Sequence, residues 1–200
     1  MDKRRQICIK SCEKGPVTTG LIGTSRGSGV THLTVLMANY IVGVRHETCA
    51  VLEWNDHGDF ERLERIVKGK VSQSPCFTVF HADYYKAAGA RELLSCAQNG
   101  YEQILIDFGC GFRTQKIEFL RCGKKYVIGA LTEWQIEGFQ EFCHEMKGEA
   151  GYRSWRYGAA FGSEMTRREL KKRLSLPIER IPLSVDPFAL NRAMMAYFEK

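Results

Sequence analysis

Short apolar runs alternate along the chain with segments in which apolar residues recur at helical spacing. The runs predict strands at residues 17–24, 48–53, 76–81, 101–108, 125–131, 155–161 and 177–182. The periodic segments predict a first helix that ends near residue 44, and others at residues 60–67, 87–98, 133–146, 166–174 and 188–198. Strands that alternate with helices form parallel sheets with right-handed crossovers. We therefore expect an α/β fold with a mostly parallel central sheet of about seven strands and helices on both faces.

Finer predictions concern the ends of these elements. Residues 83–85 are expected to form a bend after the third strand. Asp59 can cap the second helix, and Asp186 followed by proline is typical of a helix start. Residues 6–11 alternate as in a short edge strand, so residues 1–16 form either such a strand or an N-terminal extension. No linker or repeat divides the sequence, and we expect residues 1–200 to form one domain.

A glycine- and serine-rich loop, residues 25–31, joins the first predicted strand to the first helix. The backbone N–H groups of such a loop converge with those of the helix N-terminus, where an anion is favoured. Gly27 and Gly29 permit the backbone conformations and the close ligand approach that a cradle for phosphate needs. The alternative is an ordinary strand-to-helix turn, because glycine-rich turns are common.

The loop departs from the phosphate-binding pattern G-x-x-x-x-G-K-[ST] at two positions. Thr24 stands where the first glycine belongs, and Val30 stands, as an exposed and uncharged contact, where the phosphate-binding lysine belongs. Thr31 keeps the hydroxyl that ligates Mg²⁺. Arg26 can supply the missing charge if it folds back over the loop, or can face solvent. His32 can donate to a phosphate or cap the helix.

Two carboxylates are expected at the carboxyl ends of strands, where open α/β sheets bind ligands. Asp107 follows four apolar residues, and an aspartate at the tip of such a strand can hold Mg²⁺ through water, although a simple turn is the alternative. Glu53 ends the second predicted strand and is either near the ligand or a solvated or capping group.

The composition narrows the class of protein but indicates no catalytic residues. The 200 residues are 44% hydrophobic and 26% charged, typical of a globular chain. No segment approaches the roughly 20 apolar residues of a membrane span, and no signal peptide follows Met1, so we expect a cytoplasmic protein. Eight scattered cysteines without C-x-x-C spacing are interpreted as reduced thiols. The charge of +6 includes a basic cluster at residues 167–173, which is either a solvated helix face or a surface for nonspecific DNA.

The order of these parts resembles the ParA/MinD family of deviant P-loop ATPases, over nearly the whole chain from Thr18. The family's K-G-G-x-G-K-T loop falls on residues 25–31, with its signature lysine on Ser25 and its phosphate lysine on Val30. Two glycines and Thr31 are kept. The family's acidic pair after the second strand falls on Glu53 and Asn55, and its magnesium-side aspartate on Asp107.

The late family pattern of a strand ending in Ile-Pro falls on Ile181 and Pro182, and the loop after that proline lies against adenine in the family. The resemblance thus implies ATP or ADP with Mg²⁺. The nucleotide contacts assigned by the loop and the resemblance are Ser25, Arg26, Gly27, Ser28, Gly29, Val30, Thr31, His32 and Pro182, with Thr31 and Asp107 for the metal. No residue is assigned a catalytic role.

Without the lysines, we interpret the chain as a degenerate member: a nucleotide-binding switch or pseudo-ATPase. Among relatives, the chain most resembles the degenerate TadZ/CpaE branch, because that branch includes members with altered loops. The resemblance implies a protein partner in a pilus, secretion or partitioning machine. The alternatives are a scaffold that keeps only the fold and a slow ATPase. A homodimer and nonspecific DNA remain open as partners.

Overall fold

A single eight-stranded sheet organises the computed structural model, which describes residues 15–200. The strands are β1 (Val17–Gly23), β2 (Cys49–Glu53), β3 (Cys76–Val79), β4 (Ala82–Tyr85), β5 (Gln103–Asp107), β6 (Lys124–Leu131), β7 (Arg156–Gly162) and β8 (Ile178–Arg180). The helices are α1 (Val30–Gly43), α2 (Asp59–Lys68), α3 (Ala90–Gln98), α4 (Lys116–Arg121), α5 (Ile136–Met146), α6 (Glu164–Leu174) and α7 (Arg192–Phe198), with a 3₁₀ turn at Tyr152–Ser154. The predicted edge strand at residues 6–11 lies outside the described residues.

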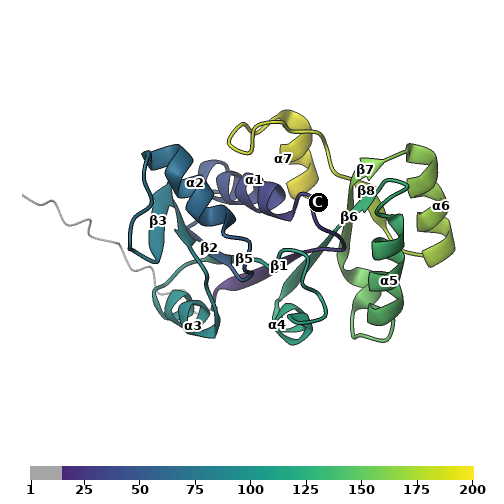
Figure 1. Ribbon diagram of the computed structural model, residues 1–200, viewed down its shortest axis with the longest axis horizontal. Coiled ribbons are helices and arrows are strands. Elements are labelled where there is room, and N and C mark those ends of the chain that lie inside the picture. Colours follow the sequence, from purple (N-terminus) through teal and green to yellow (C-terminus); the bar gives the residue numbers. More distant parts are fainter. Residues whose placement is uncertain (1–14) are drawn as a thin grey trace, which may run out of the picture.

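The strand order is β3-β4-β2-β5-β1-β6-β7-β8, and every neighbouring pair is parallel except β3 with β4. Helices cover both faces of this sheet (Figure 1). One buried cluster joins α1, α2 and α7 to one face, and a second joins α3, α4, α5 and α6 to the other. The predicted α/β class with a mostly parallel sheet is confirmed.

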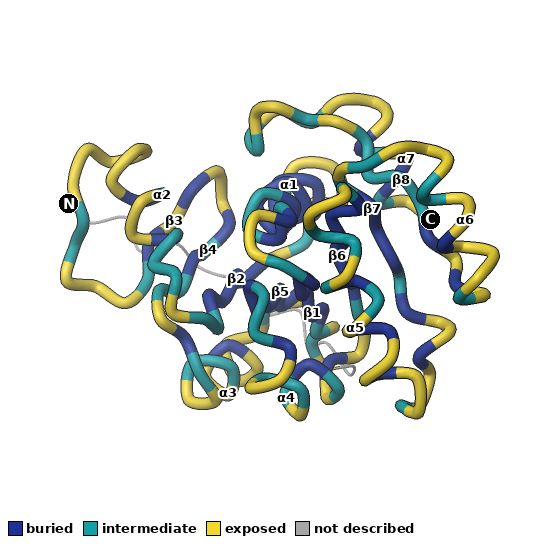
Figure 2. Tube along the Cα trace, turned by 45° about the vertical axis from the view of Figure 1, so that its right-hand side comes forward, coloured by how far each residue is buried: buried dark blue, intermediate teal, exposed yellow. Residues whose placement is uncertain are grey.

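The centre of the sheet, β1, is apolar because it is covered on both sides. Leu21 packs with the α1 cluster and Ile22 with the α5 cluster, and neither side chain is exposed. Alternate residues of β5 divide in the same way: Leu105 on one face, Ile104 and Ile106 on the other. Helix α1 is itself buried over most of its length (Figure 2). A strand and a helix buried this completely hold the loop between them in a fixed place.

The eighth strand is β4, where the prediction of a bend at residues 83–85 was wrong. The predicted strand at residues 76–81 ends at Val79, and a turn at Phe80 and His81 reverses the chain. Both turn residues have positive φ, 45° and 73°, as a two-residue hairpin requires. Asparagine and glycine normally occupy such positions, so phenylalanine and histidine concealed the turn.

Other boundaries also differ from the predictions. The last helix begins at Arg192 behind the N-cap Asn191, whose Oδ1 accepts from the Met194 N–H at 2.9 Å. Asp186 instead accepts from the Phe188 N–H, at 2.8 Å, within a turn. Helix α4, only six residues long, was not predicted, since a segment so short carries little periodic signal. Across residues 15–200, no helix combines the length and apolar character needed to cross a membrane.

Gly162 ends β7 with φ of 99°, a conformation that favours glycine. A Cβ here would collide with the Leu131 carbonyl of the neighbouring strand and lie 2.8 Å from the Leu131 Cβ. We expect Gly162→Ala to lower the free energy of unfolding by about 2–4 kcal/mol, measured by urea denaturation. The control is Gly148→Ala, because a Cβ at Gly148 meets nothing within 4 Å. Equal stability of the two variants would contradict this packing.

Candidate functional site

The loop between β1 and α1 has the backbone geometry of an anion cradle. Gly27 and Gly29 take left-handed conformations, with φ of 76° and 90°, and Gly29 is the N-cap of α1 without a capping side chain. Among the described residues, none accepts a hydrogen bond from the N–H groups of residues 29–32. Unpaired N–H groups at a helix start, together with the helix dipole, favour an anion.

A cavity of about 320 Å³ opens above these N–H groups. It is lined by all of the loop positions predicted to contact a ligand, Ser25, Arg26, Gly27, Ser28, Gly29, Val30, Thr31 and His32. The far wall is formed by His57, Asp59, Arg62, Gly109 and Cys110, from the segments that follow β2 and β5. The structure thus brings the predicted loop together with residues that were not predicted to contact a ligand.

Val30 occupies the site differently from the prediction. Its side chain is buried rather than exposed, and its Cγ2 lies 2.7 Å from the position that a Cβ at Gly23 would take. The valine therefore packs beneath the loop against β1, and only its backbone can serve a ligand. The apolar side chain stabilises the loop without supplying the charge that a lysine would bring.

Several polar groups beneath the loop are buried without a partner. Over residues 15–200, unpaired buried atoms include the hydroxyls of Thr24, Ser25 and Ser28 and the Oδ2 atom of Asp107. Buried polar groups in native proteins are nearly always hydrogen-bonded, so a cluster of exceptions requires an explanation. Ser25 and Ser28 line the cavity, and Asp107 accepts from Gly109, which lines it too, so most of these groups lie in its wall or directly behind it.

Asp107 ends β5 next to β1 and β2 and is completely buried. Its Oδ1 accepts from the Gly109 N–H at 2.8 Å and from the Asn55 amide at 3.4 Å. Burial raises the pKa of Asp107 to about 6, against the lowering effect of the Thr31 hydroxyl and the Gly109 N–H. The negative charges of Glu53 and Asp59 raise this pKa further. Asp107 is therefore a carboxylate that would gain from a nearby cation.

Thr31 also lies beside a second acid. Its hydroxyl donates to the Asp59 carboxylate at 3.4 Å, and the other oxygen of Asp59 accepts from Arg62 at 2.6 Å. Mg²⁺ is typically held by one or two carboxylates together with phosphate oxygens and water. Thr31, Asp107 and Asp59 fit this ion in the presence of a phosphate ligand. Neither Asp59 nor Arg62 was predicted from the sequence to belong to the site, and Asp59 was predicted only to cap a helix.

Glu53 serves helix α2 rather than a ligand. Its Oε1 accepts from the N–H groups of Asp59 and Phe60, at 2.6 and 3.1 Å. The cap predicted for Asp59 is therefore wrong: Asp59 is the first residue of α2, Gly58 is its N-cap, and Glu53 satisfies the first N–H groups. Burial raises the pKa of Glu53. Asn55 faces β5, where its amide donates to the Asp107 carbonyl at 3.0 Å.

His32 and Pro182 meet at a neighbouring cavity of about 230 Å³. The His32 Nε2 donates to the Ser184 carbonyl at 2.8 Å, which ties the start of α1 to the segment after β8. Apolar side chains, among them Leu36, Phe161 and Leu183, form much of the remaining wall. Gly29 and His32 line both cavities, so the apolar one adjoins the loop cavity.

Arg26 is exposed and makes no ion pair with any described residue. Its carbonyl accepts from the Gln135 side chain at 2.8 Å, which holds the loop against the segment that precedes α5. Arg62 forms an ion pair with Asp59 through one terminal nitrogen, and its side chain is otherwise largely exposed. Arg26 and Arg62 both line the cavity, and position 30, where the family's phosphate lysine would stand, is a valine.

Comparison with known proteins identifies the fold. The sequence matches no protein-family model, and no match was found among curated proteins. The structure is similar to a plasmid partition protein from Borrelia burgdorferi bound to AMPPNP, with a TM-score of 0.65 and 14% identity over 93% of this chain and 96% of that one. It is also similar to a ParA family ATPase from Chlorobium tepidum (TM-score 0.58, 15% identity, 84% of each chain). The MinD cell division protein of Aquifex aeolicus gives a TM-score of 0.56 at 13% identity, over 84% of this chain and 83% of that one.

These similarities extend over most of both chains, and identities of this size establish the fold alone. The expected resemblance to ParA and MinD ATPases is confirmed at that level: the chain has their fold, and its loop cavity lies after β1, beside the end of β5.

The raised pKa of Asp107 predicts how stability depends on pH. Its ordinary pKa is 3.8, so between about pH 4 and 6 the folded chain holds a proton that the unfolded chain releases, and stability falls as pH rises. From pH 4.5 to 7.5 the wild type should lose about 2 kcal/mol more than Asp107→Asn, measured by urea unfolding. Asp56→Asn, at an exposed position, should behave as the wild type. An identical pH dependence of wild type and Asp107→Asn would show that the pKa of Asp107 is not raised by folding.

Proposed function

We propose that the chain is a nucleotide-binding switch that holds ATP or ADP with Mg²⁺ in the loop cavity and hydrolyses it slowly or not at all. The observation that carries this proposal is the set of N–H groups at residues 29–32, which make no hydrogen bond to any residue from 15 to 200 and border the loop cavity. The buried Asp107 lies behind Gly109 in the wall of that cavity. The phosphates would accept from these N–H groups, and Thr31 with Asp107 and Asp59 would hold the metal ion.

The base would occupy the apolar cavity beside Pro182. This cavity shares Gly29 and His32 with the loop cavity, so one elongated ligand can fill both. The hydrogen bond from His32 to the Ser184 carbonyl holds the segment after β8 next to the start of α1, so this segment would lie at the edge of the same ligand. Nucleotide binding would thereby set the position of that segment, and a partner could distinguish the bound from the free protein by that position.

Slow or absent hydrolysis follows from the missing lysines. Ser25 and Val30 carry no charge, and the Val30 side chain is directed into the core. Arg26 and Arg62 can bind phosphate, but neither occupies the lysine position on the loop. Because proteins of this fold include a plasmid partition protein and a cell division protein, we further propose that the chain gates a protein partner in a partitioning, pilus or secretion machine, in the manner of a TadZ/CpaE-like protein.

A scaffold that binds no nucleotide is the second candidate. The packing of Val30 against β1 favours it, because the loop keeps its shape without a ligand. The two proposals differ in one measurement, calorimetric titration with ATP and ADP in the presence of Mg²⁺. Heat of binding supports the switch, and its absence for both nucleotides supports the scaffold.

The metal ligands predict a variant with a selective defect. Thr31→Val keeps the shape of the side chain but removes its hydroxyl, so the affinity for ATP in Mg²⁺ should fall about tenfold. In EDTA the same variant should bind as the wild type does, because the hydroxyl then has no ion to hold. A loss of equal size in both conditions would show that Thr31 acts on the loop rather than on the metal.

Arg26 and Arg62, which line the loop cavity, are each expected to contribute to ATP affinity. Arg26→Ala and Arg62→Ala should each weaken ATP binding by about tenfold, since each removes a charge-assisted contact to phosphate. Arg91→Ala, at an exposed position on α3, is the matched control. Unchanged affinity in either loop-cavity variant would remove that arginine from the site.

A further inference from the structure

Large apolar side chains gather where β7 and β8 end. Phe161 is 47% exposed at the end of β7, Met165 is 77% exposed at the start of α6, and Leu183 is 80% exposed after β8. Phe161 and Leu183 line the same cavity and are therefore close together. Single exposed apolar residues are ordinary, but a group of them around one strand edge is typical of an interaction site.

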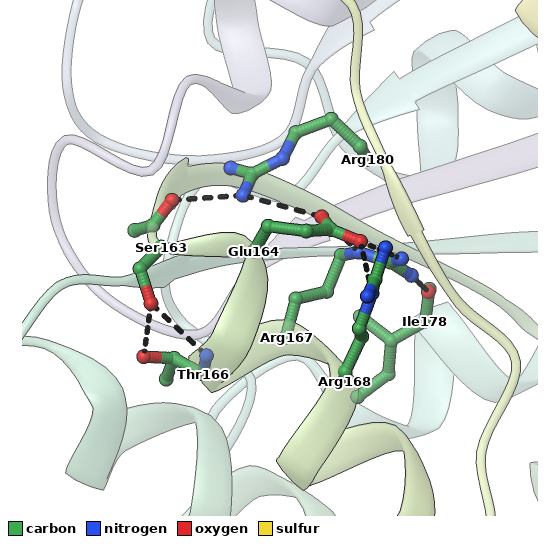
Figure 3. Close-up of polar contacts among 8 residues, drawn as sticks. Ser163, Glu164, Thr166, Arg167, Arg168, Ile178 and Arg180 are labelled. Carbon is green, nitrogen blue, oxygen red and sulfur yellow. Dashed lines mark hydrogen bonds and ion pairs between the residues drawn. The ribbon is translucent and has the colours of Figure 1, made fainter.

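Three arginines converge on one carboxylate beside this apolar group (Figure 3). Glu164 pairs with Arg167 at 2.5 Å, with Arg168 at 3.0 Å and, more distantly, with Arg180 at 3.8 Å. One negative charge cannot balance three positive ones, so the cluster keeps a surplus of positive charge. Glu164 nevertheless fixes the guanidinium groups in place, which lowers the entropic cost of binding an anion.

The free donors of this cluster belong to Arg168 and Arg180. Arg167 is largely buried and also donates to the Ile178 carbonyl, so its hydrogen bonds are used within the protein. The Arg168 side chain is 76% exposed and, among the described residues, donates only through Nε. Arg180 uses one terminal nitrogen on the Gly162 carbonyl, at 2.8 Å, next to Phe161. Arg180 therefore lies beside Phe161, and Arg168 follows Met165 by three residues, on the same side of α6.

We propose that this surface, formed by Phe161, Met165, Arg168, Arg180 and Leu183, docks an acidic amphipathic segment of a protein partner. The apolar face of the segment would cover Phe161, Met165 and Leu183, and its carboxylates would pair with Arg168 and Arg180. Nucleic acid fits less well, because a phosphate backbone would leave the three apolar side chains facing water. The inference rests on the proposed switch and adds the chemistry of its partner. None of these five residues belongs to the nucleotide loop, and Phe161 and Leu183 also line the cavity proposed for the base.

The test uses the full chain without nucleotide, so its outcome is independent of nucleotide binding. The probe is a fluorescent peptide of about 16 residues with leucines at helical spacing and glutamates elsewhere. Two companion peptides replace the leucines by serines or the glutamates by lysines, and a short DNA duplex is the fourth probe. Binding is measured by fluorescence anisotropy for the wild type, Arg168→Glu and Leu183→Ser. Arg91→Glu and Leu94→Ser, both at exposed positions on α3, are matched controls.

The proposal predicts that only the acidic amphipathic peptide binds, and that Arg168→Glu and Leu183→Ser each weaken it about tenfold or more while the α3 variants do not. Thermal unfolding should be the same for all four variants. No binding, or equal weakening by the α3 variants, would overturn the proposal. Binding of the duplex that is lost in Arg168→Glu but kept in Leu183→Ser would overturn it in favour of nucleic acid.

Discussion

The start of α1 determines what this protein can bind. Gly29 takes a left-handed conformation and no side chain caps the helix, so the N–H groups of residues 29–32 are left without an acceptor among the described residues. Because α1 is buried against the sheet, these N–H groups cannot turn away or fray into solvent. The helix dipole adds to their attraction for a negative group. A second set of unsatisfied atoms, at Ser28 and Asp107, lies beneath the same loop.

The packing beneath the loop explains how its shape is held with a valine at position 30. Val30 packs under the loop against Gly23, in space that a Cβ at Gly23 would fill. The loop is thus held by apolar packing from below and by the Gln135 contact to Arg26 from the side. Charge can then come from Arg26 and Arg62, which flank the cavity but lie outside the lysine position. Such a site can retain binding while losing most of its capacity for phosphoryl transfer.

Much of the fold could be predicted because it rests on local patterns. The buried strands around Leu21 and Leu105 and the strongly apolar helix α1 carry periodicity that the sequence displays directly. The hairpin at Phe80 and His81 was hidden because its positive φ angles fall on unusual residues. The loop and Asp107 were predictable from their positions at strand ends. Arg62 and Asp59 were not, because their approach to Thr31 depends on how α2 packs across the sheet edge.

The proposed nucleotide site and the proposed docking surface have residues in common. Leu183 belongs to both the apolar cavity and the docking surface, and Ser184 beside it accepts from His32 at the start of α1. A base bound under this segment would therefore bear on the surface that meets the partner. If both proposals hold, this shared segment is where nucleotide binding would be coupled to partner binding.

The most direct test of the cradle is the amide spectrum of the protein recorded by NMR while ADP and Mg²⁺ are added. The account predicts that the N–H resonances of residues 29–32 shift most strongly downfield, as expected for amides that acquire a phosphate acceptor. Spectra in which these four resonances stay in place at saturating ADP, or in which the largest shifts lie away from the loop, would contradict it.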